Sequence, residues 1–245
     1  MKSTSLYEGN HHKWIVFGRD TGKSEKIIDT NQYMISTQQQ TMLLDPGGIE
    51  LFSAMLAGVL NHTSIEKVTT LFASHQDPDI ISSLGLWDKT IPNAKLYAPW
   101  LWEGFIRHFG MENIEYKAIP DQGQELRLDS VTLKFIPAHY LHSSGNFHVY
   151  DPDAKILMSG DIGAALEDAE APMFVEGFAS HADKMRYFHQ RWMPSNSAKK
   201  NWVARVRELD IEMMAPQHGR IFKGEAVQEF LEWFDNLEVG IVNSK

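Results

Sequence analysis

The chain has 245 residues, of which 43% are hydrophobic and 22% charged, an ordinary composition for a folded protein with a sizeable core. A net charge of −9 disfavours nucleic acid or an anionic membrane as the main partner, and the lack of an 18-residue apolar run or an N-terminal apolar segment predicts a cytoplasmic protein without membrane span or signal peptide. The absence of cysteine excludes disulfides, iron–sulfur clusters, cysteine nucleophiles and zinc–thiolate sites, so that any metal must be held by nitrogen and oxygen.

The first half of the chain predicts short strands alternating with helices. Strands are expected where β-favouring residues stand between polar turns, at residues 14–18, 32–36, 41–44, 71–72 and 95–98. Apolar residues at helical spacing predict a helix over 51–60. Further helices are expected from 78 to about 87 and from 99 to 108.

The second half predicts two hairpins followed by helices. Strands at 125–128 and 131–136 flank one turn, and strands at 147–150 and 155–159 flank another. A long helical region covers roughly 181–209 and is interrupted near Pro194, while 211–215 reads as a strand and 224–236 as an amphipathic helix. Because no low-complexity linker interrupts the pattern, the sequence predicts a single α/β domain over residues 1–245, with two packed sheets and helices outside.

Candidate metal ligands occur in four loops, each just after a predicted strand. In chain order they are His75, Asp77, Asp79, His142, Asp161 and His218. A single histidine in such a place is more often a hydrogen-bonded structural residue, and an aspartate after Ser-Gly is usually a turn former. Their joint occurrence instead predicts a metal site built from imidazole and carboxylate.

Five motifs in order along the chain resemble the metallo-β-lactamase superfamily, and within it the oxygen-binding diiron domain of flavodiiron proteins. They are Asp45-Pro46-Gly47, His75-Gln76-Asp77-Pro78-Asp79, Leu141-His142-Ser143, Ser159-Gly160-Asp161 and Ala215-Pro216-Gln217-His218-Gly219. The resemblance covers essentially the whole chain, and it implies an αββα sandwich with a dinuclear metal centre.

The resemblance also implies a role for each ligand. One metal would be held by His75, Asp77 and His142 and the other by Asp79 and His218, with Asp161 bridging both. Carboxylate-rich sets with a bridging aspartate suit iron or manganese better than zinc. We therefore expect two iron ions, joined by an oxo or hydroxo bridge, with zinc or manganese as the alternative metals.

Two positions depart from the family pattern, and one nearby histidine is ambiguous. Asp77 stands where glutamate is common, so its carboxylate is one methylene shorter. Ile80 stands where a second histidine is common and cannot bind a metal, which predicts an open or water-filled position at the second metal. We expect His139, three residues before His142, to have a structural or supporting role rather than to be a ligand.

The expected function is a non-haem diiron protein that binds, senses or reduces dioxygen, with nitric oxide as a further ligand. Flavodiiron reductases carry a flavin-binding domain, and this chain shows no flavin-phosphate loop or Gly-x-Gly-x-x-Gly motif. We therefore expect either a separate electron donor or, preferably, an oxygen sensor with a signalling partner. The resemblance also implies a homodimer.

Two other classes remain open. The first is a dinuclear metal-dependent hydrolase acting on an ester or phosphodiester, in which two cations activate a bound water. The substitution of histidine by isoleucine at position 80 counts against it. The second is a metal-free interaction module, which the six retained candidate ligands disfavour.

Overall fold

The central strands of the N-terminal half are buried on both faces, and this determines the layered architecture. In strand β2 (His12–Gly18), Trp14 and Val16 belong to one apolar cluster, whereas Ile15 and Phe17 belong to another. Because successive side chains of a strand point to opposite faces, both faces of this sheet must be covered. The computed structural model, which describes residues 1–18, 27–168 and 170–242, shows what covers them.

The first sheet has seven strands in the order β1 to β7. Strands β1 to β4 are antiparallel neighbours, and β4 to β7 are parallel. The other strands are β1 (Lys2–Glu8), β3 (Gln32–Thr37), β4 (Thr41–Leu44), β5 (Val68–Phe72), β6 (Lys95–Pro99) and β7 (Glu115–Ile119).

The second sheet has six strands in the order β13-β12-β11-β10-β9-β8, antiparallel except for the parallel pair of β11 and β12. Its strands are β8 (Glu125–Leu128), β9 (Val131–Pro137), β10 (Phe147–Asp151), β11 (Ile156–Gly160), β12 (Met213–Pro216) and β13 (Phe222–Lys223).

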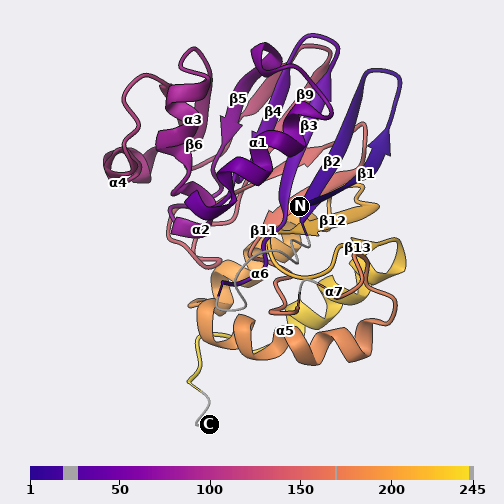
Figure 1. Ribbon diagram of the computed structural model, residues 1–245. Coiled ribbons are helices and arrows are strands. Elements are labelled where there is room, and N and C mark those ends of the chain that lie inside the picture. Colours follow the sequence, from indigo (N-terminus) through magenta and orange to yellow (C-terminus); the bar gives the residue numbers. More distant parts are fainter. Residues whose placement is uncertain (19–26, 169, 243–245) are drawn as a thin grey trace.

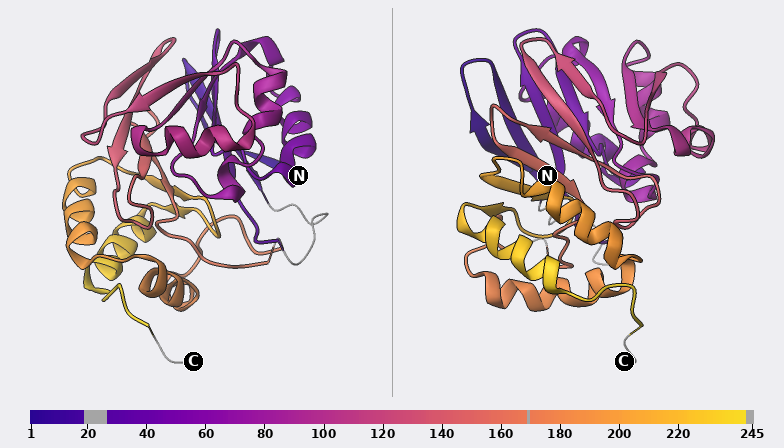
Figure 2. Two further views of the ribbon diagram at one scale, coloured as in Figure 1. Left: turned by 90° about the vertical axis from the view of Figure 1, so that its left-hand side faces the viewer. Right: turned by 180° about the vertical axis from the view of Figure 1, so that it is seen from behind.

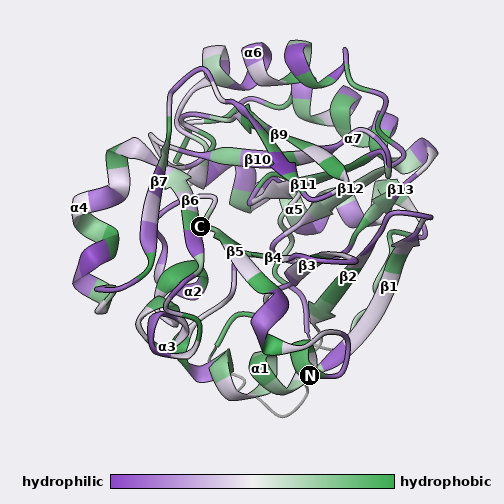
Figure 3. Ribbon diagram, turned by 90° about the horizontal axis from the view of Figure 1, so that it is seen from above, coloured by the Kyte–Doolittle hydropathy of each residue, from purple (hydrophilic) through white to green (hydrophobic). Residues whose placement is uncertain are grey.

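Helices lie on both outer sides of the two sheets (Figure 1 and Figure 3). The first group is α1 (Phe52–Leu60), α2 (Pro78–Ile81), α3 (Leu84–Thr90) and α4 (Glu103–Ile106), with short 3-10 helices η1 (Ile49–Leu51), η2 (Ile65–Lys67), η3 (Trp100–Trp102) and η4 (Arg107–Phe109). The second group is α5 (Phe178–Trp192), α6 (Asn196–Val206) and α7 (Glu225–Asn236), which gather on one side of the molecule in orange to yellow (Figure 2).

Three apolar clusters fill the spaces between these layers. One joins residues of the two sheets, such as Phe72 and Phe135, whose rings stack with centroids 5.3 Å apart. A second cluster lies between the first sheet and α1 to α3, and a third lies between the second sheet and α5 to α7. The order helix, sheet, sheet, helix is the predicted αββα sandwich, and that prediction is confirmed.

Most predicted elements are present, with local differences. The interruption near Pro194 separates α5 from α6, and the Ser195 hydroxyl caps α6 by accepting from the Ala198 N–H. The helix predicted over 78–87 is divided into α2 and α3 near Ser83, whose buried hydroxyl donates to the Gly47 carbonyl. None of the helices in the described part of the chain combines the length and apolar character that a membrane crossing requires.

Candidate metal centre

The predicted ligands meet because each follows a strand that ends at the same edge of the two-sheet sandwich. His75 lies three residues after β5, and Asp161 follows β11 directly. His218 follows β12, the parallel neighbour of β11, and the Gln217 N–H donates to the Gly160 carbonyl at 2.7 Å. His142 lies in the loop between β9 and β10. Segments far apart in sequence therefore converge on one place.

The first half of the centre contains His75, Asp77, His142 and Asp161, whose donor atoms all lie within 4.8 Å of one another. The His142 Nε2 atom is 3.2 Å from Asp77 Oδ2 and 2.7 Å from Asp161 Oδ2. The His75 Nε2 atom is 3.6 Å and 3.3 Å from the same two oxygens. Four donors thus face a common point.

The second half contains Asp79 and His218, and it shares Asp161 with the first. The His218 Nε2 atom is 3.3 Å from Asp79 Oδ2 and 3.4 Å from Asp161 Oδ1. Asp161 therefore directs Oδ2 to the first half and Oδ1 to the second. The structure brings all six predicted residues together, in the two groups that the sequence assigned.

Two glycines beside these residues explain parts of the motifs. Gly160 has a φ of +51°, in the left-handed region that favours glycine, and it turns the chain directly before Asp161. Gly219 has a φ of +80°, and a Cβ atom there would lie 2.8 Å from the Ala165 carbonyl oxygen. A side chain at Gly219 would displace the loop that follows Asp161 or the loop that carries His218.

Hydrogen bonds to the far nitrogens orient two of the imidazoles. The Ser74 hydroxyl donates to Asp45 Oδ2 at 2.8 Å, so it accepts from His75 Nδ1 at 2.9 Å. The His218 Nδ1 atom lies 3.0 Å from the Asp29 carbonyl oxygen, which can only accept. Both rings therefore carry the Nδ1 proton and direct Nε2 into the centre, as metal-binding histidines do.

The Asp77 carboxylate is held by a similar relay. The Gln76 side-chain amide donates to Asp77 Oδ1 at 3.0 Å, and the Ser143 hydroxyl donates to Gln76 Oε1 at 2.7 Å. Since Ser143 follows His142, the loop that supplies one donor also orients another. Asp77 Oδ2 is thereby directed to the centre.

The electrostatics of the centre favour positive charge. Burial alone would lower the pKa of its imidazoles, but Asp161 and its neighbouring carboxylates raise the pKa of His142 to about 8 and of His218 to about 10. Burial would likewise raise the pKa of Asp161, but His75, His142 and His218 hold it well below its usual range. Ionised carboxylates therefore attract protons or a metal cation to this place.

The donor set fits a pair of metal ions. Ligands about 2.1 Å from one ion lie about 3.0 Å apart at right angles and about 3.4 Å apart in a tetrahedron. The nitrogen–oxygen distances within each half range from 2.7 to 3.6 Å and so lie on either side of these values. In addition, His75 Nε2 and Asp161 Oδ1 are buried and make no hydrogen bond, and a cation would satisfy both.

His139 and Ile80 are not donors to the centre in this structure. The His139 Nε2 atom donates to the Asp121 carbonyl at 2.8 Å, and its Nδ1 atom accepts from the Asn146 N–H at 3.4 Å. The structural role expected for His139 agrees with these contacts. The Ile80 side chain is fully buried in the apolar cluster between the first sheet and α1 to α3.

Sequence reasoning missed several residues that contact the centre. Ser74, Gln76 and Ser143 lie beside the ligands in sequence, so their position was a usable signal. Trp192, at the end of α5, packs edge-on against the His142 ring with centroids 5.4 Å apart. Fifty residues separate Trp192 from His142, so no local pattern in the sequence links them.

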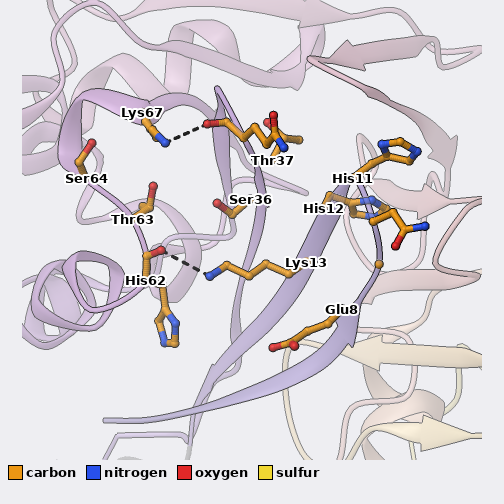
Figure 4. A pocket seen from close by; sticks show the side chains of 13 residues that line it. Glu8, His11, His12, Lys13, Ser36, Thr37, His62, Thr63, Ser64 and Lys67 are labelled. Atoms are coloured by element: carbon orange, nitrogen blue, oxygen red, sulfur yellow. Dashed lines mark hydrogen bonds between the residues drawn. The ribbon is translucent and has the colours of Figure 1, made fainter.

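A hollow of about 520 Å³ lies at the end of the first sheet that is opposite to the metal centre (Figure 4). Its lining includes residues 36–38 and 63–64, which stand before β4 and β5, whereas Asp45 and His75 stand after them. Lys13 and Lys67 donate across it to backbone carbonyls of His62 and Gln38, at 3.4 and 2.8 Å. Both lysines of the hollow are thus hydrogen-bonded within the protein. The metal centre, by contrast, brings several side-chain donors to one point.

Comparison with protein families identifies the fold and the family together. The model of the ODP family of β-lactamase-like proteins matches residues 28–219, which include all six candidate ligands. The chain belongs to the ODP family. The predicted resemblance and fold class are therefore confirmed.

Solved structures similar to this ODP-family chain include two of a chemotaxis sensor. One, described as the peroxy diiron species of chemotaxis sensor ODP, is 40% identical, covers 98% of this chain and 97% of its own, and has a TM-score of 0.87. The apo state of chemotaxis sensor ODP from T. denticola is also 40% identical, with coverages of 98% and 96% and a TM-score of 0.86.

More distant similarity extends to longer proteins. The flavodiiron protein from Giardia intestinalis is 18% identical, and the match covers 96% of this chain and 59% of that protein, with a TM-score of 0.82. This similarity supports the fold. Uncharacterized protein MJ0732 of Methanocaldococcus jannaschii is 26% identical over 215 residues, which are 84% of this chain and 53% of that protein. The ODP-family chain thus spans about half the length of this curated relative.

Proposed function

We propose that this protein holds two iron ions at the shared-aspartate centre and binds dioxygen there as a sensor. The observation that carries the proposal is Asp161, whose two oxygens face separate donor groups of a buried His/Asp cluster. Support comes from the 40% identity, over nearly the whole chain, to a chemotaxis sensor whose structure is described as a peroxy diiron species.

Each candidate ligand has a role in this proposal. His75, Asp77 and His142 would hold one iron, Asp79 and His218 would hold the other, and Asp161 would bridge them. Ferrous ions, when bound, supply the electrons with which dioxygen reacts. The protein contributes the Ser74 and Asp29 contacts that orient the imidazoles, and the Trp192 ring covers His142 on one side.

The donor set also favours iron over the zinc expected of a hydrolase. The carboxylates of Asp77, Asp79 and Asp161 offer hard oxygen donors, which suit iron or manganese. With a bridging carboxylate, the centre carries more negative charge than a histidine-rich set and so stabilises higher oxidation states of the metal. The proposal also includes a homodimeric state. It further includes a signalling partner for the sensor, or an electron donor if the protein is a reductase.

The test is anaerobic loading with ferrous iron, followed by exposure to air. We expect two irons per chain and a charge-transfer absorption band in the visible region that appears on exposure. His142→Ala should abolish the band. His139→Ala is the matched control, because His139 lies in the same loop and uses both ring nitrogens within the protein.

Two other results would point elsewhere. Stoichiometric zinc without a visible band, together with hydrolysis of an ester or phosphodiester, would support the hydrolase. Continuous dioxygen consumption in the presence of an added electron donor would support a reductase in place of the sensor.

A further inference from the structure

Two glutamines contact the two outer carboxylates of the centre, and they do so differently. Gln76 Nε2 donates to Asp77 Oδ1 at 3.0 Å. Gln217 Nε2 lies 3.3 Å from Asp79 Oδ2. The two halves of the centre thus carry the same kind of side chain in comparable places, and one glutamine serves as a comparison for the other.

The amide of Gln76 is fixed in one orientation. Its Oε1 atom accepts from the Ser143 hydroxyl at 2.7 Å, so the NH₂ group must face Asp77. It contacts Oδ1, whereas Oδ2 is the oxygen that faces His142. Gln76 therefore orients the carboxylate from behind.

The amide of Gln217 has no such restraint on its oxygen. The side chain is buried, and Oε1 makes no hydrogen bond. Buried acceptors in folded proteins are nearly always hydrogen-bonded, so this one requires an explanation. The backbone of Gln217 is meanwhile held on both sides, with its N–H donating to Gly160 and its carbonyl accepting from the Asn31 N–H.

The amide of Gln217 also contacts the oxygen that faces the centre. Asp79 Oδ2 is 3.3 Å from the amide nitrogen and 3.3 Å from His218 Nε2. Both distances lie between the values of about 3.0 and about 3.4 Å that separate neighbouring ligands of one ion. Because the two ends of an amide are nearly the same size, a half turn would place Oε1 where Nε2 now lies. The turn breaks no hydrogen bond of Oε1, and it replaces the hydrogen bond from Nε2 to Asp79 by a contact with the metal.

We infer that Gln217 is a ligand of the second metal through Oε1. This assignment rests on the proposed dinuclear centre and adds a residue to its second half. A neutral amide oxygen is a hard donor suited to iron or manganese. It would fill a coordination position that Ile80, an apolar residue in the core, cannot fill.

The test measures stepwise metal binding by Gln217→Leu, Gln217→Glu and the control Gln76→Leu. The probes are manganous ion, counted by electron paramagnetic resonance, and cobaltous ion, followed by its visible absorption. Gln217→Leu should weaken the second binding step tenfold or more and raise the absorption of the second cobalt, because its coordination number falls. Gln76→Leu should instead change the affinity of the first binding step.

Gln217→Glu distinguishes a ligand from a hydrogen-bond donor. As a ligand, the carboxylate should tighten the second step relative to wild type. If Gln217 only donated to Asp79, a carboxylate would repel that oxygen and weaken the step, which would overturn the assignment. A second step within twofold of wild type in Gln217→Leu would overturn it as well.

The proposed function can fail separately. A wild-type protein that binds fewer than two metals would refute the dinuclear centre before any variant is compared. Thermal melting of the metal-free variants checks their folding. Should Gln217→Leu not fold, Gln217→Asn, whose amide is one methylene shorter, should lose the second step while keeping the same polar group.

Discussion

The Ser74 hydroxyl links a candidate ligand to a buried carboxylate, and its removal gives a quantitative prediction. Ser74→Ala leaves His75 Nδ1 without its acceptor and Asp45 Oδ2 without its donor. Two buried polar groups lose a partner, each at about 1–3 kcal/mol. Burial raises the pKa of Asp45 to about 7, so uptake of a proton can relieve part of the loss. We expect the metal-free variant to be less stable by roughly 2–3 kcal/mol.

Metal binding should suffer as well, because the imidazole is no longer held in the Nδ1–H tautomer. Loss of such an outer contact typically lowers metal affinity by about 10–100-fold. Urea unfolding of the metal-free protein measures the first effect. Anaerobic competition for ferrous iron against a chromophoric chelator measures the second.

Ser83→Ala is the matched control. Ser83 is also fully buried, and its hydroxyl makes one hydrogen bond, to the Gly47 carbonyl at 2.6 Å. We expect a stability loss of about 1 kcal/mol and unchanged metal affinity. Equal metal affinity in Ser74→Ala, Ser83→Ala and wild type would refute the reasoning that Ser74 orients a ligand.

Three further predictions concern pH, access and stability. The carboxylates raise the pKa of His142 to about 8, so a metal must displace a proton below that pH, and metal affinity should rise from pH 6 to 8. The protonated imidazole stabilises the metal-free protein fully below about pH 6.5, the pKa of the unfolded state, and this stability should be lost as the pH rises through 8. Calorimetry in buffers of different ionisation enthalpy would detect the released protons, and a pH-independent affinity would contradict the assignment of His142. Trp192→Ala should speed removal of the metal by a chelator several-fold, whereas Trp100→Ala, equally 51% exposed, should not. Asp151→Ala should lower the free energy of unfolding in urea by about 3 kcal/mol or more, because the buried His12 and Trp14 donors, at 2.6 and 2.7 Å, lose their acceptor. The control Asp153→Ala, on the exposed turn, should leave the stability nearly unchanged.

The candidate ligands could be proposed from the sequence because their signals are local. The candidate ligands lie within a few residues after β5, β9, β11 and β12, and Gly160 and Gly219 mark the tight turns beside Asp161 and His218. Pairing of β11 with β12 then brings these two loops together. A contact between residues far apart in the chain leaves no local pattern in the sequence, so the packing of Trp192 on His142 could not be predicted.

The elements that were missed depend on their neighbours rather than on their own residues. Strand β1 is mostly exposed and was not predicted, because its conformation comes from pairing with β2 at the edge of the sheet. Strand β7, with the half-polar sequence Glu115–Ile119, likewise forms against β6. The helix predicted over 99–108 is instead the succession η3, α4 and η4, where Trp102 donates to the Gly145 carbonyl.

The central claim is that Asp161 joins two irons into one centre. Electron paramagnetic resonance of the iron-loaded protein after exposure to air, with the iron content of the same sample, tests it most directly. The account predicts two irons per chain whose spins are coupled, so that the signal of isolated high-spin ferric iron is absent, and it predicts that this signal appears in Asp161→Asn. One iron per chain, or the isolated ferric signal in the wild-type protein, would contradict it.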